Sequence, residues 1–304
     1  MRHFLNLFAQ ESEFLAEILQ TAKLMKSPGL PKPYETLRNR IIALIFEKPS
    51  LRTRVSFEAA VTHLGGRSLF ISGNEVGLGT RESICDFART MSQYVDGLVM
   101  RVFKQHTVEE TSKFATIPVI NGLSDLSHPC QVMGDFLTIQ ELFGDIKGKS
   151  IVFVGDGNNV SRSLAVGCAK LGLEFTLVCP EGYGFDATFA KQYQEMFERP
   201  IPPELRNPDS ALPRADIIYT DVWTSMGQEA EQEHRLKAFR SYQVNDSLLK
   251  KAPKHVQIFH CLPAHREEEI THTCFEKFAD TIFQQAGNRL HAQKAILHCL
   301  FAKK

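Results

Sequence analysis

The sequence predicts an α/β protein of two domains, each a mainly parallel sheet flanked by helices on both faces. Short apolar runs that suit buried strands alternate with longer segments whose apolar residues recur at helical spacing. The alternation restarts after a helical segment at residues 129–143, and a chain of 304 residues is long enough for two cores. Strands that alternate with helices favour parallel sheets, because each helix brings the chain back to the end of the sheet where the previous strand began.

The first domain is expected at residues 1–145. A helix at 11–25 is followed by a proline-rich break. Strands are expected at 41–46, 68–72, 97–101 and 117–120, with helices at 51–64, 81–94 and 107–116. Residues 73–80 are rich in glycine and predict a loop, and residues 129–143 predict the helix that joins the two halves.

The second domain is expected at residues 146–285. Its predicted strands are 150–154, 174–179, 215–219 and 255–259, with helices at 160–171 and within 180–213. Charged residues dominate 228–237, a pattern typical of a solvated surface, and a terminal helix is expected from residue 286.

Composition excludes several classes of function. The 35 basic residues balance 35 acidic ones, so no global field favours nucleic acid or an anionic membrane. No apolar run approaches the roughly 18 to 20 residues of a membrane span. Seven cysteines without CxxC spacing fit reduced thiols better than disulfides or a zinc site, and the N-terminus lacks a secretory pattern. We therefore expect a cytoplasmic protein.

The segment between the first strand and its helix predicts an anion site. Ser50 suits a helix N-cap, and Arg52, Thr53 and Arg54 follow within one turn. Helix N-termini carry free N–H groups and partial positive charge, to which the two guanidinium groups add. The pattern favours a phosphate or a phosphorylated metabolite over the alternative, a capped helix whose arginines face water.

A second candidate lies at the start of the joining helix. His128 precedes Pro129, which suits the first helical position. Such a histidine is more often only a cap or a solvated group. Because Gln131 lies three residues further on, the two side chains could face one ligand from the same helix end.

Polar residues also follow three strands of the second domain. Asn158 and Asn159, Asp221 and Cys261 stand where open α/β sheets bind ligands, at the carboxyl ends of strands. The glycine-rich turn at 155–159 has Val160 where a dinucleotide fingerprint needs its third glycine. An NAD-dependent dehydrogenase is therefore disfavoured.

Together these stretches resemble the aspartate/ornithine carbamoyltransferase family over essentially the whole chain. The resemblance rests on five motifs in the family's order and approximate spacing: Ser50-Leu51-Arg52-Thr53-Arg54, His128-Pro129-Cys130-Gln131, Asp221-Val222-Trp223-Thr224-Ser225-Met226-Gly227, His260-Cys261-Leu262-Pro263 and Asn288-Arg289. The second half is similar to the ornithine-specific branch. The resemblance implies carbamoyl transfer from carbamoyl phosphate to L-ornithine without metal or organic cofactor, as in arginine biosynthesis. It also implies a homotrimer with active sites between subunits and a terminal helix, residues 286–304, that packs back on the first domain.

The resemblance implies site residues in both domains. Those for carbamoyl phosphate are Ser50, Leu51 through its backbone N–H, Arg52, Thr53, Arg101, His128 and Gln131. Those for ornithine are Asn159, Asp221, Ser225, Met226, Cys261 and Leu262. Those expected in catalysis are Arg101, His128, Asp221, Cys261 and Arg289. Arg54 is expected to brace the loop rather than to touch the ligand.

More specific roles follow from the same resemblance. His128 would donate toward the carbonyl oxygen, where negative charge grows. Asn159 would take the α-carboxylate and Asp221 with Ser225 the α-ammonium group. Cys261 would border the δ-amine, together with the carbonyl of the next residue.

Two departures from the family pattern and several rival functions stay open. Leu51 replaces a common Thr, which a backbone donor tolerates, and Gly77 replaces a Gln or His that reaches a neighbouring subunit in many ornithine-specific members. Rival amines are putrescine, an acylated ornithine and aspartate. Aspartate is disfavoured by the Ser225-Met226-Gly227 loop with Asp221 before it, which suits an amino acid that presents an α-ammonium group. An acylated ornithine would place a neutral amide against Asp221, and putrescine lacks the carboxylate that Asn159 would bind. A non-catalytic metabolite-binding protein is disfavoured by the retained Arg52, Arg101, His128 and Cys261.

Overall fold

The computed structural model describes residues 2–27, 34–224 and 229–302. The chain divides into two compact units, Met1–Leu137 with Asn288–Lys304, and Thr138–Gly287. The divisions fall inside helices α6 (Pro129–Phe143) and α12 (Ala279–Phe301), so each of these helices contributes residues to both units.

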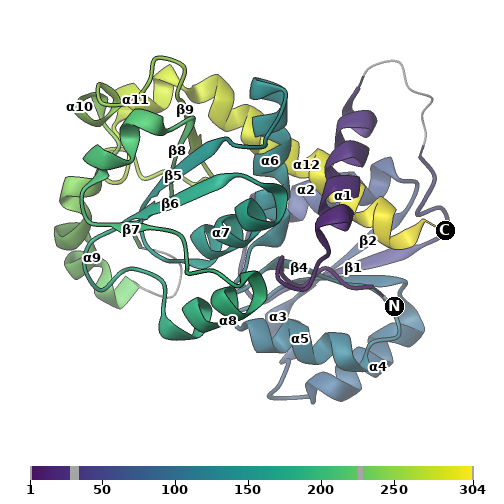
Figure 1. Ribbon diagram of the computed structural model, residues 1–304. Helices are drawn as coiled ribbons and strands as arrows, with labels where there is room; N and C mark the ends of the chain where they lie inside the picture. The colour runs from purple at the N-terminus through teal and green to yellow at the C-terminus, as the bar shows by residue number, and fades with distance from the viewer. Residues whose placement is uncertain (1, 28–33, 225–228, 303–304) are drawn as a thin grey trace. The chain divides into compact units, whose positions relative to one another are not determined.

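The first unit is built on a parallel sheet with the strand order β2-β1-β3-β4. Its strands are β1 (Ile41–Phe46), β2 (Arg67–Ser72), β3 (Gly97–Arg101) and β4 (Val119–Leu123). Its further helices are α1 (Ser12–Lys26), α2 (Leu51–His63), α3 (Gly73–Val76), α4 (Ile84–Tyr94) and α5 (Gln105–Phe114). Helices α4 and α5 lie on one face, and α1 and α2 on the other (Figure 1).

Side chains on the two faces of this sheet explain the layers. Successive strand residues point to opposite faces, so Ala43 and Ile45 of β1 pack in one cluster with Phe87 of α4 and Val108 of α5. On the other face, the ring of Phe301 in α12 approaches Gly97 so closely that a Cβ there would lie 2.6 Å from it.

The second unit contains a five-stranded parallel sheet with the order β7-β6-β5-β8-β9. Its strands are β5 (Ser150–Val154), β6 (Glu174–Val178), β7 (Glu204–Leu205), β8 (Ile217–Thr220) and β9 (Gln257–His260). Its α-helices are α7 (Asn159–Leu171), α8 (Ala187–Phe197), α9 (Gln232–Phe239), α10 (Asp246–Leu249) and α11 (His272–Lys277), besides the shared α6 and α12. Short 3₁₀ turns are η1 (Pro208–Ser210), η2 (Leu212–Arg214), η3 (Glu229–Glu231) and η4 (Arg240–Tyr242).

Both sheets have a point at which the strand order reverses. The chain moves outward from β1 to β2 and then returns to β3 on the other side of β1. In the second sheet β5 is followed by β6 and β7 on one side and by β8 on the other. Open parallel sheets bind ligands in the crevice at the carboxyl ends of such strands. The residues after β1, β3, β5 and β8 are therefore the ones that the fold places for binding.

The predicted fold class is confirmed, and the structure differs from three local predictions. The predicted loop at 73–80 contains the short helix α3. Gly77 ends this helix with a φ of 59°, a left-handed conformation that glycine adopts readily. Residues 230–234 are exposed, as expected for a solvated surface, although α9 begins at Gln232 and Arg235 within it is buried. The terminal helix begins at Ala279, seven residues before its expected start. Helices α10 and α11 were not predicted, because four to six residues carry too little periodicity.

Candidate active site

The N-terminus of α2 has the geometry of a capped helix. Ser50 is extended, with φ −162° and ψ 108°, and its Oγ accepts a hydrogen bond from the Thr53 N–H at 3.3 Å. The side chain of Leu51 is exposed (77%), while its backbone lies in the first turn of the helix. The first turn contains no acidic residue, which leaves the positive end of the helix uncompensated.

Thr53 connects α2 to two guanidinium groups from distant parts of the first unit. Its buried Oγ1 accepts from Arg289 Nη2 of α12 at 2.7 Å and from Arg101 Nη1, at the end of β3, at 3.5 Å. The two arginines therefore converge on the first turn of α2.

The cluster of Arg52, Arg101 and Arg289 carries an excess of positive charge. Burial and then the charges of Arg289 and Arg52 lower the pKa of Arg101 to about 10, so it remains protonated at pH 7. Within the described ranges, neither Arg52 nor Arg101 forms an ion pair with a carboxylate. A bound anion would relieve the mutual repulsion of these groups, and it would lie against free helical N–H groups.

His128 is a neutral imidazole beside this cluster. It is buried, and burial followed by the charges of Arg289 and Arg101 holds its pKa well below the usual value. At pH 7 it therefore carries one ring N–H and can donate a hydrogen bond.

Gln131, one turn further along α6, is held by its amide nitrogen. Its Nε2 donates to Asp135 Oδ1 at 2.8 Å. Its Oε1 is buried and has no hydrogen-bond partner among the described residues. That oxygen is an acceptor that a ligand N–H group would satisfy.

Gly134 permits a close approach of α6 and α12. A Cβ at this position would lie 3.2 to 3.3 Å from Arg289 N, Cα and Cγ. Such contacts are tighter than ordinary packing, so the absence of a side chain at Gly134 helps to set the position of Arg289.

Arg54 points away from this cluster. Its guanidinium pairs with Glu58 Oε1 at 3.0 Å and lies over the ring of Phe70, 3.7 Å from the centroid. These contacts match the bracing role expected for Arg54, which remains a prediction.

In the second unit, Asp221 follows β8 and binds groups from two neighbouring strand ends. Its Oδ2 accepts from Asn158 Nδ2 at 3.0 Å, and its Oδ1 accepts from the Cys261 thiol at 2.9 Å. Asn158 also caps α7, since its Oδ1 accepts from Val160 N–H at 2.9 Å. The structure therefore brings Asp221 and Cys261 together.

The segment around Leu262 is held by a buried histidine. Leu262 N–H donates to His260 Nδ1 at 2.9 Å, so the other ring nitrogen carries the proton and donates to Glu269 Oε1 at 3.0 Å. Leu262 has a φ of 59°, unusual for a residue with a branched side chain, and precedes a cis-proline. Asn159 is the first residue of α7 and is half-buried. Ser225 and Met226 lie outside the described residues.

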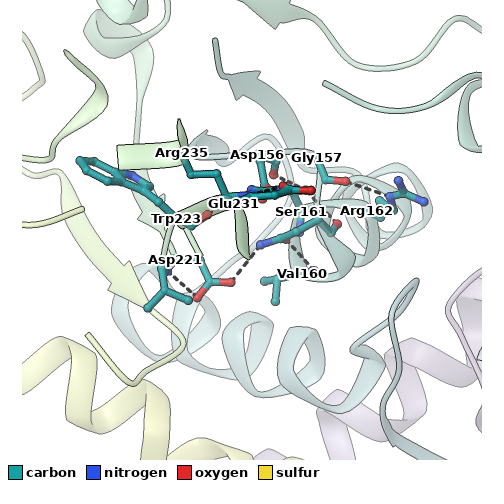
Figure 2. A network of polar contacts seen from close by, with 11 residues as sticks. Asp156, Gly157, Val160, Ser161, Arg162, Asp221, Trp223, Glu231 and Arg235 are labelled. Carbon is teal, nitrogen blue, oxygen red and sulfur yellow. Dashed lines mark hydrogen bonds and ion pairs between the residues drawn. The ribbon is translucent and has the colours of Figure 1, made fainter. Parts of the chain in front are cut away.

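Arg235 anchors two of these strand ends, and the sequence pattern gave no sign of it. Its Nη1 donates to Asp156 Oδ2 at 2.7 Å and to the Trp223 carbonyl at 3.1 Å, while its Nε donates to Glu231 at 3.0 Å (Figure 2). Only 8% of its side chain is exposed. The guanidinium thus joins the turn after β5 to the segment after β8.

The carboxyl group of Asp156 is largely buried in this network, which changes its pKa. Desolvation raises its pKa to about 6, although Arg235 opposes that shift, and the charge of Asp221 adds to it. Ser161 of α7 donates to the Asp156 carbonyl at 2.9 Å, which fixes the backbone of the same turn (Figure 2).

Two further features bear on metal binding and membranes. Among the described residues, one group of side chains could hold a metal ion. It consists of His265, Glu268 and Glu269, whose possible ligand atoms all lie within 4.8 Å of one another. His265 pairs with Glu268, and Glu269 accepts from His260, so these side chains already bind protein partners. In the described part of the chain, every helix is too short or too polar to cross a membrane.

Comparison with known proteins defines the class to which this fold and these residues belong. Residues 2–141 match the family model "Aspartate/ornithine carbamoyltransferase, carbamoyl-P binding domain", and residues 147–300 match "Aspartate/ornithine carbamoyltransferase, Asp/Orn binding domain". The chain therefore belongs to the aspartate/ornithine carbamoyltransferase family.

Individual relatives fall within one branch of that family. The chain is 48% identical to an ornithine carbamoyltransferase of Archaeoglobus fulgidus, with 100% of this chain and 99% of the relative covered. It is 47% identical to an anabolic ornithine carbamoyltransferase of Pyrococcus furiosus, with 94% and 92% covered. A solved structure of the P. furiosus enzyme superposes with a TM-score of 0.92 at 46% identity, covering 99% of this chain and 97% of that one.

Proposed function

We propose that this chain transfers the carbamoyl group of carbamoyl phosphate to the δ-amine of L-ornithine, giving L-citrulline and phosphate in arginine biosynthesis. The observation that carries the proposal is the convergence of Arg52, Arg101 and Arg289 with a neutral His128 at the capped N-terminus of α2. The names of the relatives support the same reaction.

The first unit supplies what carbamoyl phosphate needs. The phosphate would lie on the N–H groups of α2, held by Ser50, Arg52 and Thr53. Arg101 would bridge the phosphate and the carbamoyl oxygen. The neutral ring of His128 would donate to that oxygen as it gains negative charge, and Gln131 Oε1 would accept from the carbamoyl NH₂ group.

The chemistry is an addition followed by an elimination, with a tetrahedral intermediate between them. The lone pair of the neutral amine forms the new C–N bond, the C–O bond to phosphate then breaks, and the departing phosphate takes up the proton that the amine loses. Phosphate is already a good leaving group. Catalysis therefore depends on positioning and on stabilising the developing charge, with no covalent intermediate on the enzyme.

The second unit would hold ornithine and favour its neutral amine. A Lys-like amine has a pKa near 10.4, so deprotonation at pH 7 costs about 4.6 kcal/mol in water. Burial lowers that cost. Asp221 and Cys261, which are in direct contact, would orient the amine as its proton leaves. Asn159 would bind the α-carboxylate, and Ser225 and Met226 are proposed to complete the site.

The choice of amine is tested by incubating the purified protein with carbamoyl phosphate and, separately, ornithine, putrescine, N-acetylornithine and aspartate. We expect carbamoylation of ornithine alone at a useful rate. Product from putrescine alone would overturn the assigned amine, and no product from any amine would favour a metabolite-binding protein.

We also propose a cytoplasmic homotrimer. All seven cysteines are free thiols, which suits a reducing compartment. Val55 is 52% exposed on the same face of α2 as the exposed Leu51, an apolar pair that a neighbouring subunit would cover. Sedimentation should give three times the chain mass of 34.3 kDa, and a monomer at micromolar concentration would contradict the assembly.

A further inference from the structure

A short turn carries His128, and it closes on itself. Strand β4 ends at Leu123, and the turn of residues 124–127 leads directly into His128 and α6. Ser124 N–H donates to the Ser127 carbonyl at 2.9 Å, and Ser127 N–H donates to Ser124 Oγ at 3.2 Å. Both serines, at the two ends of the turn, are buried, whereas Asp125 and Leu126 between them are exposed.

Asn121 of β4 points its amide nitrogen into this turn. The Nδ2 atom lies 3.3 Å from Ser124 Oγ and 3.5 Å from the Ser127 carbonyl, besides Leu5 O at 2.9 Å and Gln105 Oε1 at 3.1 Å. An amide has only two N–H bonds, so the four acceptors share them. None of the Asn121 surface is exposed, and its donor therefore has no competing solvent.

Gln105, the first residue of α5, holds the turn from another side. Its Oε1 accepts from Ser124 Oγ at 2.5 Å, and its backbone N–H donates to Asp125 Oδ1 at 2.8 Å. The Asn121 carbonyl also accepts from the Cys130 thiol at 3.3 Å, two residues after His128. The chain is thus fixed before His128 by side chains of β4 and α5, and after it by the Cys130 thiol, which binds the backbone of β4.

This network is more elaborate than a chain connection requires. A connecting turn can lie on the surface, where water satisfies its polar groups, whereas the buried Ser124 and Ser127 each require a protein partner. The effect of the burial is to define the direction in which the His128 ring leaves the backbone. For a donor that must meet a developing oxyanion, that direction matters, since a misplacement of about 1 Å can cost about a hundredfold in rate.

We propose that Asn121, Gln105 and Ser124 are positioning residues for carbamoyl transfer, acting through the turn that they fix to aim His128 at the carbamoyl oxygen. The inference rests on the proposed function of His128. The three residues do not touch the substrate. Their contribution should therefore appear in the chemical step and not in the binding of phosphate, which is proposed to take place at α2 and its arginines.

The test compares Ser124→Ala and Gln105→Met with a matched control, Thr111→Val. Thr111 is also fully buried and lies on α5, but its hydroxyl bonds to the Thr107 carbonyl of the same helix and takes no part in the turn. For each protein one measures kcat, KM for carbamoyl phosphate, the inhibition constant of inorganic phosphate and the melting temperature.

We expect kcat to fall about 10- to 100-fold in Ser124→Ala and Gln105→Met, while the inhibition constant of phosphate changes less than about twofold. Thr111→Val should lose a similar amount of melting temperature and keep its kcat. Equal losses of kcat and phosphate affinity, or a kcat that follows melting temperature across all three variants, would overturn the positioning role. So would an unchanged kcat in either test variant. If the wild-type protein formed no citrulline, the proposed reaction would fail and the positioning role with it.

Discussion

Thr53 shows how a single small side chain can organise larger ones. Its hydroxyl accepts from two guanidinium groups that reach it from β3 and from α12, while its own N–H is bound by the helix cap at Ser50. Holding like charges together in a buried place is unfavourable, and Arg101 responds with a lowered pKa. A buried cluster of cationic groups of this kind is suited to binding an anion.

The two arginines of the first turn of α2 offer a matched pair of substitutions. Arg52→Met removes a charge that lowers the pKa of Arg101, whereas Arg54→Met removes one that already pairs with Glu58. We expect phosphate inhibition to weaken by at least about tenfold in Arg52→Met, as for a charged hydrogen bond of about 1.5–3 kcal/mol. Arg54→Met should stay within about threefold of wild type, as for a surface pair worth about 0–1 kcal/mol. Equal effects would mean that the anion does not bind at Arg52.

His128 makes a prediction about stability and pH. Its pKa is depressed in the folded state, so between pH 7 and 5 the unfolded chain takes up a proton that the folded chain refuses. The unfolding free energy should therefore fall as pH drops through about 6.5, with a slope of at most about 1.4 kcal/mol per pH unit from this group. Urea unfolding of wild type and His128→Gln across that range checks this. The difference between them should shrink toward pH 5, and a constant difference would contradict a buried neutral imidazole.

Among the secondary-structure elements, the strand ends at the reversal points of the two sheets carry most of the chemistry. Ser50 follows β1 and Arg101 ends β3, while Asp156 and Asp221 follow β5 and β8. Helix α12 adds Arg289 to the first of these sets, although it lies far from α2 in sequence. Two properties can be tested by substitution. One is the close approach of α12 to Gly134 of α6, and the other is the contact of Arg235 with the segment after β8.

The close approach of α6 and α12 is tested by replacing Gly134 with alanine. Gly134→Ala places a methyl group 3.2 to 3.3 Å from the backbone and Cγ of Arg289, so we expect a loss of about 1–3 kcal/mol of stability and a lower kcat. The control is Gly287→Ala on α12, where nothing lies within 4 Å and alanine should stabilise by up to about 1 kcal/mol. Thermal unfolding and steady-state kinetics measure both. A stable, fully active Gly134→Ala would show that Arg289 tolerates a wider spacing.

Arg235 tests how the end of β8 is held. Arg235→Met leaves Asp156, whose side chain is 12% exposed, without its buried cation, and breaking such pairs costs about 3–5 kcal/mol. Because Arg235 also binds the Trp223 carbonyl, two residues after Asp221, we expect KM for ornithine to rise more than KM for carbamoyl phosphate. Lys237→Met, an exposed change on the same helix, should alter stability by less than about 0.5 kcal/mol. Equal increases in the two KM values would argue against a specific effect on the segment after β8.

For the molecule as a whole, local pattern predicted the parallel strands and the capped helix at Ser50, because these depend on neighbours in sequence. Local pattern did not predict the buried position of Arg235. The sequence around it is charged and reads as a solvated surface, yet its burial is set by Asp156, 79 residues away. Asn158 was noticed as a polar residue at a strand end, but its bond to Asp221 depends on the pairing of β5 with β8. Contacts of this kind follow from topology, which no short window contains.

Carbamoyl transfer to ornithine must give citrulline and phosphate in equal amounts. The most direct measurement follows both products in one reaction mixture of the purified protein, with spontaneous decay of carbamoyl phosphate subtracted. We expect one citrulline for each phosphate released, and no enzyme-dependent phosphate when ornithine is omitted. Phosphate released by the enzyme without an equal amount of citrulline would contradict this expectation.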